Sequence, residues 1–111
     1  MPTAQFIHDG NAIDYTPGAD TPAGSVVVLN DLIGVTKRSI KAGELGALHV
    51  VGVYAFPKAT GSDTAIAKGA QTYWDAGNQQ ATTESSGNAP LGKATVAAGD
   101  DDATVQVRLS A

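Results

Sequence analysis

The longest apolar stretch of the chain covers residues 45–58, LGALHVVGVYAFPK, in which the odd and the even positions are both mainly apolar. A strand with one face in water alternates apolar with polar residues, so this pattern predicts one long β-strand that is covered on both faces. Pro57 ends it, because proline has no N–H to donate to a neighbouring strand. We expect one face to pack inside the domain and the other against a neighbouring subunit.

Two shorter runs that are rich in β-branched residues predict a hairpin. They are Gly24–Leu29 and Leu32–Thr36, and the two residues between them, Asn30 and Asp31, tolerate the positive φ of a tight turn. The C-terminal segment Thr104–Leu109 alternates cleanly, which predicts a strand with Val105, Val107 and Leu109 facing inward. The same reasoning predicts further strands at residues 12–16, 70–75, 79–83 and 91–97.

Together these runs predict an all-β fold, a small sandwich or barrel of about eight short strands. One short helical turn is expected near residues 63–68, capped by Ser62 or Asp63 and closed by Gly69 in a left-handed conformation. Residues 12–111 are expected to form a single β domain. Residues 1–11 are expected to form an extended N-terminal arm whose only large apolar side chains are Phe6 and Ile7.

Composition indicates a thin hydrophobic core. The 111 residues include 13 glycines and only six aromatic residues, and alanine supplies much of the apolar fraction. Small side chains bury little area each, at about 25 cal/mol per Å². We therefore expect self-association or a partner to add stability.

Charge and cysteine usage argue against several classes of function. The net charge is −4 and the seven basic residues are scattered, whereas a nucleic-acid groove needs concentrated Lys and Arg. There is no cysteine, hence no disulfide or zinc–thiolate site. No apolar run approaches the roughly 20 residues that span a bilayer, so we expect a soluble protein without nucleic-acid or membrane partners.

The most suggestive chemical motif is Gly87–Lys93, which has the G-x-x-x-x-G-K spacing of a phosphate-binding loop. Ala94 stands where a hydroxyl should hold magnesium, and a β-type run follows where the motif requires a helix. Nucleotide binding is therefore disfavoured. His8 and His49 lack a second ligand at metal spacing, and Asp100–Asp102 lacks the alternate spacing of a calcium loop, so we expect no metal, no cofactor and no enzyme activity.

The aromatic residues allow two interpretations. Tyr73 and Trp74, with Tyr54 and Phe56, could form a platform for a sugar ring. Adjacent residues of a strand point to opposite faces, however, so Tyr73 and Trp74 cannot both line one platform. One of them is expected in the core and the other at the surface or an interface.

The order of several short segments resembles a family of small bacteriophage capsid decoration, or cement, proteins, often labelled as RecA/RadA-type recombinases. The resemblance spans essentially the whole chain and rests on FIHDG (6–10), IDY (13–15), SVVV (25–28), LIGV (32–35), AGELGAL (42–48), GVYAFPK (52–58), GAQTYWD (69–75), LGKA (91–94) and TVQVRL (104–109). The recombinase label disagrees with the sequence, because a RecA-type core needs an α/β nucleotide domain.

The resemblance implies a β-rich structural protein that binds the outer surface of an assembled head and stabilises the capsid lattice. Its partner would be the major capsid protein, and a homotrimer is favoured. It would be found on the virion, and in the bacterial cytoplasm during assembly. A carbohydrate- or host-surface-binding module and, less plausibly, a nucleotide-dependent recombination protein remain alternatives.

Two sets of residues are the expected contacts. The arm would meet the capsid by strand addition, through Gln5, Phe6, Ile7 and His8. The expected oligomer interface comprises His49, Val51, Val53, Tyr54, Tyr73 and Trp74.

Overall fold

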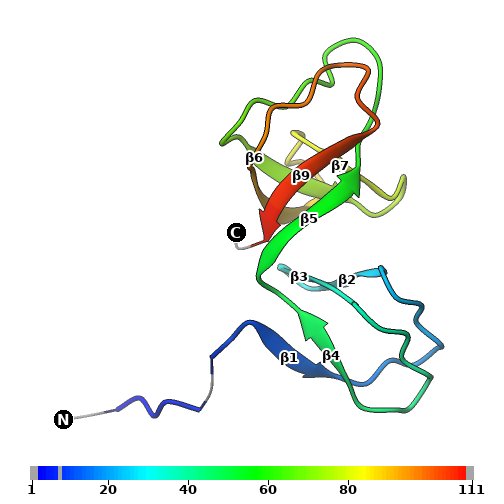
Figure 1. The fold of residues 1–111 in the computed structure, drawn as a ribbon, viewed down its shortest axis with the longest axis vertical. Coiled ribbons are helices and arrows are strands. Elements are labelled where there is room, and N and C mark those ends of the chain that lie inside the picture. Colours follow the sequence, from blue (N-terminus) through cyan, green and yellow to red (C-terminus); the bar gives the residue numbers. More distant parts are fainter. Residues whose placement is uncertain (1–2, 8, 110–111) are drawn as a thin grey trace.

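The structure is a computed structural model that describes residues 3–7 and 9–109. Within these residues it contains nine β-strands and no helix, which confirms the predicted all-β class (Figure 1). The strands are β1 (Ala12–Tyr15), β2 (Val26–Leu29), β3 (Leu32–Val35), β4 (Gly46–His49), β5 (Gly52–Pro57), β6 (Gln71–Asp75), β7 (Gln80–Thr82), β8 (Ala89–Ala94) and β9 (Thr104–Leu109).

The strands form two sheets, which we call the first and the second sheet. The first has the order β1-β4-β3-β2 and contains the predicted hairpin, β2–β3, whose turn residue Asn30 has a φ of 57°. Residues with a short polar side chain tolerate this left-handed conformation, which explains why Asn-Asp can connect the two strands. The hairpin prediction is confirmed.

The second sheet has the order β5-β9-β8-β6-β7, and it curls so that its two outer strands approach each other. Lys58, just after β5, forms a bridge with Ala81 of β7. In β9 the side chains of Val105, Val107 and Leu109 are buried and the intervening ones are exposed, as the alternation predicted.

The prediction of one strand over Leu45–Lys58 is wrong. The segment forms β4 in the first sheet and β5 in the second, and Figure 1 shows the chain passing from one sheet to the other between them. Gly52 opens β5 with a φ of 129°, a value that favours glycine. Within the chain itself the two faces are not both covered, since Val53 is 54% exposed and Leu45 is 70% exposed, and cover by a neighbouring subunit stays a prediction.

The predicted helical turn at residues 63–68 is also absent. Asp63 has a φ of 63°, which a right-handed helical turn does not allow, and Ile66 forms an antiparallel bridge with Ala98. Ile66 is buried by this pairing, so burial of a hydrophobic side chain overrides the local helix signal. Gly69 does adopt the expected left-handed conformation, with a φ of 85°.

One hydrophobic core joins the two sheets. Ile33 and Val35 from β3 belong to the same buried cluster as Phe56 and Trp74 from the second sheet. Most of the cluster comes from the second sheet and the loops around it, including Ile66 and Ala98. The first sheet therefore packs against the second through one face of the β2–β3 hairpin.

Candidate functional site

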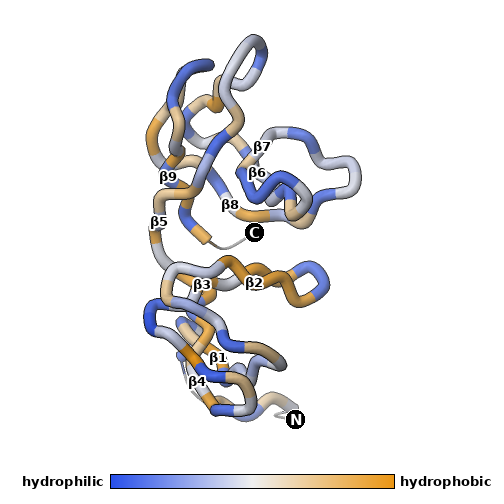
Figure 2. The backbone as a smooth tube through the Cα atoms, turned by 90° about the vertical axis from the view of Figure 1, so that its right-hand side faces the viewer, coloured by the Kyte–Doolittle hydropathy of each residue, from blue (hydrophilic) through white to orange (hydrophobic). Residues whose placement is uncertain are grey.

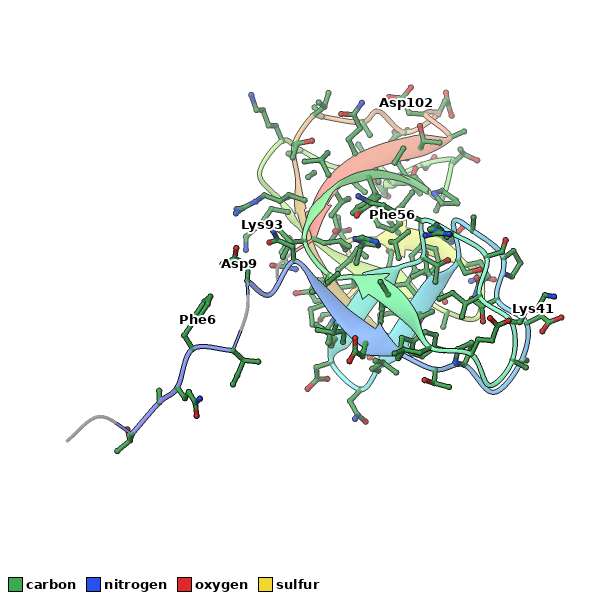
Figure 3. The ribbon with its side chains drawn as sticks, turned by 60° about the horizontal axis from the view of Figure 1, so that its bottom comes forward. Phe6, Asp9, Lys41, Phe56, Lys93 and Asp102 are labelled. Carbon is green, nitrogen blue, oxygen red and sulfur yellow. The ribbon has the colours of Figure 1, made fainter. Side chains whose placement is uncertain are left out.

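The N-terminal arm projects from the body of the domain (Figures 1 and 3). Phe6 is 79% exposed and Ile7 is 74% exposed, and Gln5 is exposed as well. His8, the fourth residue of the predicted capsid contact, lies outside the described residues. An exposed aromatic next to an exposed β-branched residue is the composition of a segment that gains free energy when it binds another surface.

The residues of the predicted oligomer interface lie in different places. Val51 and Val53 are exposed, at 37% and 54%, along the junction of β4 and β5. Tyr54 is half-buried, with the Lys37 ammonium 5.8 Å from its ring centroid. His49 is half-buried in β4, opposite Ala12 of β1. Of the six predicted residues, only Val51 and Val53 are exposed.

The aromatic pair of β6 divides as predicted. Trp74 is 3% exposed, and its ring meets that of Phe56 edge-on at 5.9 Å, so it belongs to the core. Tyr73 is half-buried on the opposite face. The Phe56 ring in turn meets that of Tyr54 at 6.3 Å. Three of the four aromatics considered for a sugar platform, Tyr54, Phe56 and Trp74, therefore contact one another edge-to-face.

The phosphate-loop spacing of residues 87–93 falls largely on a strand. Residues 89–94 are β8, and the Lys93 ammonium donates a hydrogen bond to Oε1 of Gln71 on β6, at 3.0 Å. This is a cross-strand pair on the surface of the second sheet, since Lys93 is exposed. A phosphate cradle instead needs backbone N–H groups that converge at a helix N-terminus.

The acidic residues serve the loops. The Asp100 carboxylate accepts hydrogen bonds from the N–H groups of Thr64 and Ala65, and Asp102 accepts one from Gly99 N–H. Asp75 accepts from the side chain and N–H of Asn78 and from Gly77 N–H, and these bonds hold the pKa of its carboxyl below the ordinary value of 3.8. Within residues 3–7 and 9–109, no group of three or more His, Asp or Glu side chains could hold a metal ion.

Lys58 is buried, and its ammonium ties two loops together. It donates hydrogen bonds to the carbonyl oxygens of Ala59 and Asp100 and to the hydroxyl of Thr64, at 2.6, 3.4 and 3.3 Å. Three oxygen acceptors match the three donors of an ammonium group. We interpret this lysine as structural.

No helix in the described part of the chain is long and apolar enough to cross a membrane.

Sequence reasoning did not identify the β2–β3 hairpin as a surface. Val28, Leu29 and Leu32 near its tip are 39%, 36% and 42% exposed, and Figure 2 shows the hydrophobic colour running along β2 to a hydrophilic turn. The signal was present in the sequence, because Val26–Leu29 is aliphatic at every position and so has two apolar faces.

Two open crevices follow β2 on the side that faces the second sheet. One, of about 310 Å³, is lined by residues that include Ser25, Val26 and Trp74. The other, of about 360 Å³, is lined by residues that include Val28, Trp74 and Asn88. Trp74 borders both crevices, and polar residues such as Ser25 and Asn88 line them as well.

Comparison with known proteins identifies one family. A family model described as phage cement protein matches residues 7–109. No curated protein and no solved structure matches the chain significantly. The family match covers almost the whole described chain and confirms the resemblance found in the sequence.

Proposed function

This chain belongs to the phage cement protein family, and we propose that it binds the outer surface of an assembled phage head and stabilises the capsid lattice. The family is a structural one that implies a location on the virion capsid. The observation that carries the proposal is the family match over residues 7–109. An all-β fold in the described residues supports it, because a RecA-type protein needs an α/β nucleotide domain.

We propose the major capsid protein as the partner and the arm as the contact. Phe6 and Ile7 are exposed, and fully burying such a side chain contributes roughly 1.5–3 kcal/mol each. Strand addition to a capsid edge would supply hydrogen bonds to the arm backbone as well. Each bound copy would bridge neighbouring capsid subunits, and binding to the assembled lattice alone stabilises it by mass action.

We propose a homotrimer on the capsid lattice, with the bacterial host cytoplasm as its location during assembly. The self-contacts we favour are the exposed Val51 and Val53, together with the half-buried His49 of β4, Tyr54 of β5 and Tyr73 of β6. Trp74 would support this interface only indirectly, by packing in the core, because its side chain is buried. Alanine-rich composition and a small core make added contacts valuable to stability.

Co-sedimentation with undecorated, expanded heads tests the proposal. The wild-type protein should pellet with heads in a saturable manner and should raise the temperature at which the heads disrupt. A protein that remains in the supernatant at every concentration would contradict capsid binding.

A matched pair of variants tests the role of the arm. The double variant Phe6→Ser, Ile7→Ser should lose head binding while the domain stays folded. Leu45→Ser is the control, because Leu45 is 70% exposed on a loop of the domain and should be dispensable. Equal binding by the two variants would remove the arm from the contact while leaving cement function itself intact.

A further inference from the structure

The free edge of β2 is unlike the other three strand edges. β1 carries the exposed Asp14, β5 contains Gly52 and Pro57, and β7 has three residues and is bridged through Lys58. Charge, proline, shortness and covering are the usual ways in which proteins protect a sheet edge. β2 is aliphatic at all four positions, and within the described residues it pairs only with β3.

The edge presents hydrogen-bonding groups at defined positions. In a hairpin closed by two residues the pair next to the turn, Leu29 with Leu32, is hydrogen-bonded, and bonded pairs then alternate along the ladder. The bond from Thr36 N–H to Ser25 C=O, at 3.0 Å, fits that alternation. The N–H and C=O groups of Val26 and Val28 therefore point away from β3, where an added strand would meet them.

The same chain contains a segment suited to this edge. Residues 3–7 of the arm are in no strand and make no hydrogen bond with the rest of the described chain. In an extended conformation Phe6 and Ile7 point to opposite faces. β2 offers apolar neighbours on both faces, with Val26 and Val28 beside the crevices along Trp74 and with Val27 and Leu29 on the other side.

The crevices have room for the side chain that would face them. Their volumes, about 310 and 360 Å³, are many times the roughly 30 Å³ that one water molecule occupies in the liquid. Both are bordered by the indole of Trp74, and aromatic pairs gain about 0.5–1.5 kcal/mol beyond the area they bury. An arm strand along β2 would direct Phe6 or Ile7 into them.

The arm cannot serve the β2 edge of its own chain. It precedes β1, which lies at the opposite edge of the first sheet, so it would have to cross four strand spacings of about 4.8 Å, or roughly 19 Å. Five residues, from Ala12 back to Ile7, span at most about 18 Å. Crossing the sheet would use up the arm before it could run alongside β2.

We propose that in solution the arm of one copy, residues 3–7, adds as a strand to the β2 edge of a second copy. The contact is heterologous, because arm meets edge rather than like meeting like, and such contacts close into rings when the rotation between copies permits. A ring of three would be a trimer held by arm and edge rather than by Val51 and Val53. The inference goes beyond capsid binding and does not depend on it.

Three single-chain forms test the inference by sedimentation in the micromolar range. The wild type should associate. The arm variant Phe6→Ser, Ile7→Ser should be monomeric, because its arm has no apolar side chains to bury. Val28→Pro should also be monomeric, because proline removes an outward N–H at an edge position where it is otherwise tolerated. Val28→Ala keeps that N–H and should still associate.

Mixing the two monomeric variants is the decisive experiment. The arm variant retains an intact edge and Val28→Pro retains an intact arm, so together they should form a 1:1 dimer. A mixture that stays monomeric would overturn the inference, as would a wild type that sediments as a monomer or an arm variant that associates normally. Circular dichroism checks the fold of Val28→Pro, and Val26→Pro, which removes the other outward N–H, replaces it if it unfolds.

Head binding separates this inference from the proposed function. Val28→Pro keeps its arm and should still co-sediment with heads even though it no longer associates with itself. If the arm variant and Val28→Pro are each monomeric but form no 1:1 complex when mixed, only the arm-to-edge contact is contradicted. If neither the wild type nor any variant binds heads, only the proposed capsid binding is contradicted.

Discussion

The two sheets differ in what happens at their edge strands. The second curls until Lys58 and Ala81 bridge its two outer strands, and its inward side chains, such as Val107 and Leu109, are almost fully buried. The first leaves β2 open and exposes Val28 and Leu29. Apolar side chains that a small protein leaves at an open edge are available for contacts with other chains. The second sheet thus buries its inward side chains more completely, and the first sheet holds the open edge of β2 for which we propose a contact with the arm of another copy.

The largest effect should come from a glycine of the second sheet. Gly92 has a φ of 152°, and a Cβ there would collide with the carbonyl oxygen of Arg108 on β9. This neighbour is backbone and cannot turn aside, so the sheet itself must shift. We expect Gly92→Ala to lower the free energy of unfolding by about 3 kcal/mol or more, as measured by urea denaturation.

Gly18, in the loop after β1, provides the matched control. A Cβ at Gly18 would meet nothing within 4 Å, so Gly18→Ala should change stability by no more than about 0.5 kcal/mol. If Gly92→Ala and Gly18→Ala lose similar amounts of stability, β8 can shift to accept a Cβ at Gly92. The second sheet would then be less rigid than we infer.

The next effect tests the closure of the second sheet. Lys58→Met removes the donor for three oxygen atoms around a buried position, on Ala59, Thr64 and Asp100. Hydrogen bonds from a charged donor contribute about 1.5–3 kcal/mol, so we expect a loss of about 2 kcal/mol. Lys93→Met, which removes an exposed cross-strand bond to Gln71, should cost less than about 0.5 kcal/mol. Equal melting temperatures for the two variants would contradict a structural role for Lys58.

The sequence predicted those parts of the fold in which local pattern and packing agree. In β9 every second residue is buried, so a period of two identifies both the strand and its inner face. In the β2–β3 hairpin, Asn30 supplies the left-handed turn residue between two β-branched runs. The opposite orientations of Tyr73 and Trp74 follow from the same period.

Other features depend on contacts that no local pattern encodes. The break at Val50–Val51 lies inside an apolar run, because both strands beside it are apolar and only Gly52 marks the turn between the sheets. The turn at residues 63–68 has helix signals, yet Ile66 gains more by pairing with Ala98 and entering the core. The open edge of β2 depends on strand order, which an aliphatic run does not specify.

A smaller effect on folding is expected in the first sheet. Leu29 is 36% exposed at the end of β2, so Leu29→Ser should lower the free energy of unfolding by only about 1 kcal/mol. It should weaken self-association about tenfold, since the added strand loses an apolar neighbour worth about 1.4 kcal/mol. Sedimentation over a concentration series measures the second effect. If Leu29→Ser associates normally but is much less stable, Leu29 contributes to folding rather than to the contact between copies, which contradicts this prediction.

The smallest effect concerns the β6–β7 turn of the second sheet and its dependence on pH. Hydrogen bonds from Asn78, first through its side chain, lower the pKa of Asp75 in the folded protein, so the folded state prefers the carboxylate. A depressed folded pKa contributes stability that is present above the unfolded value and is lost as the pH falls through the folded pKa. Asp75→Asn should therefore be slightly less stable than the wild type at neutral pH, and the difference should shrink below pH 3.8. Urea midpoints of both proteins across that range measure it, and a difference that grows on acidification would contradict the assigned direction. Because Asp75 is on the surface of the second sheet, neither self-association nor head binding should follow this titration.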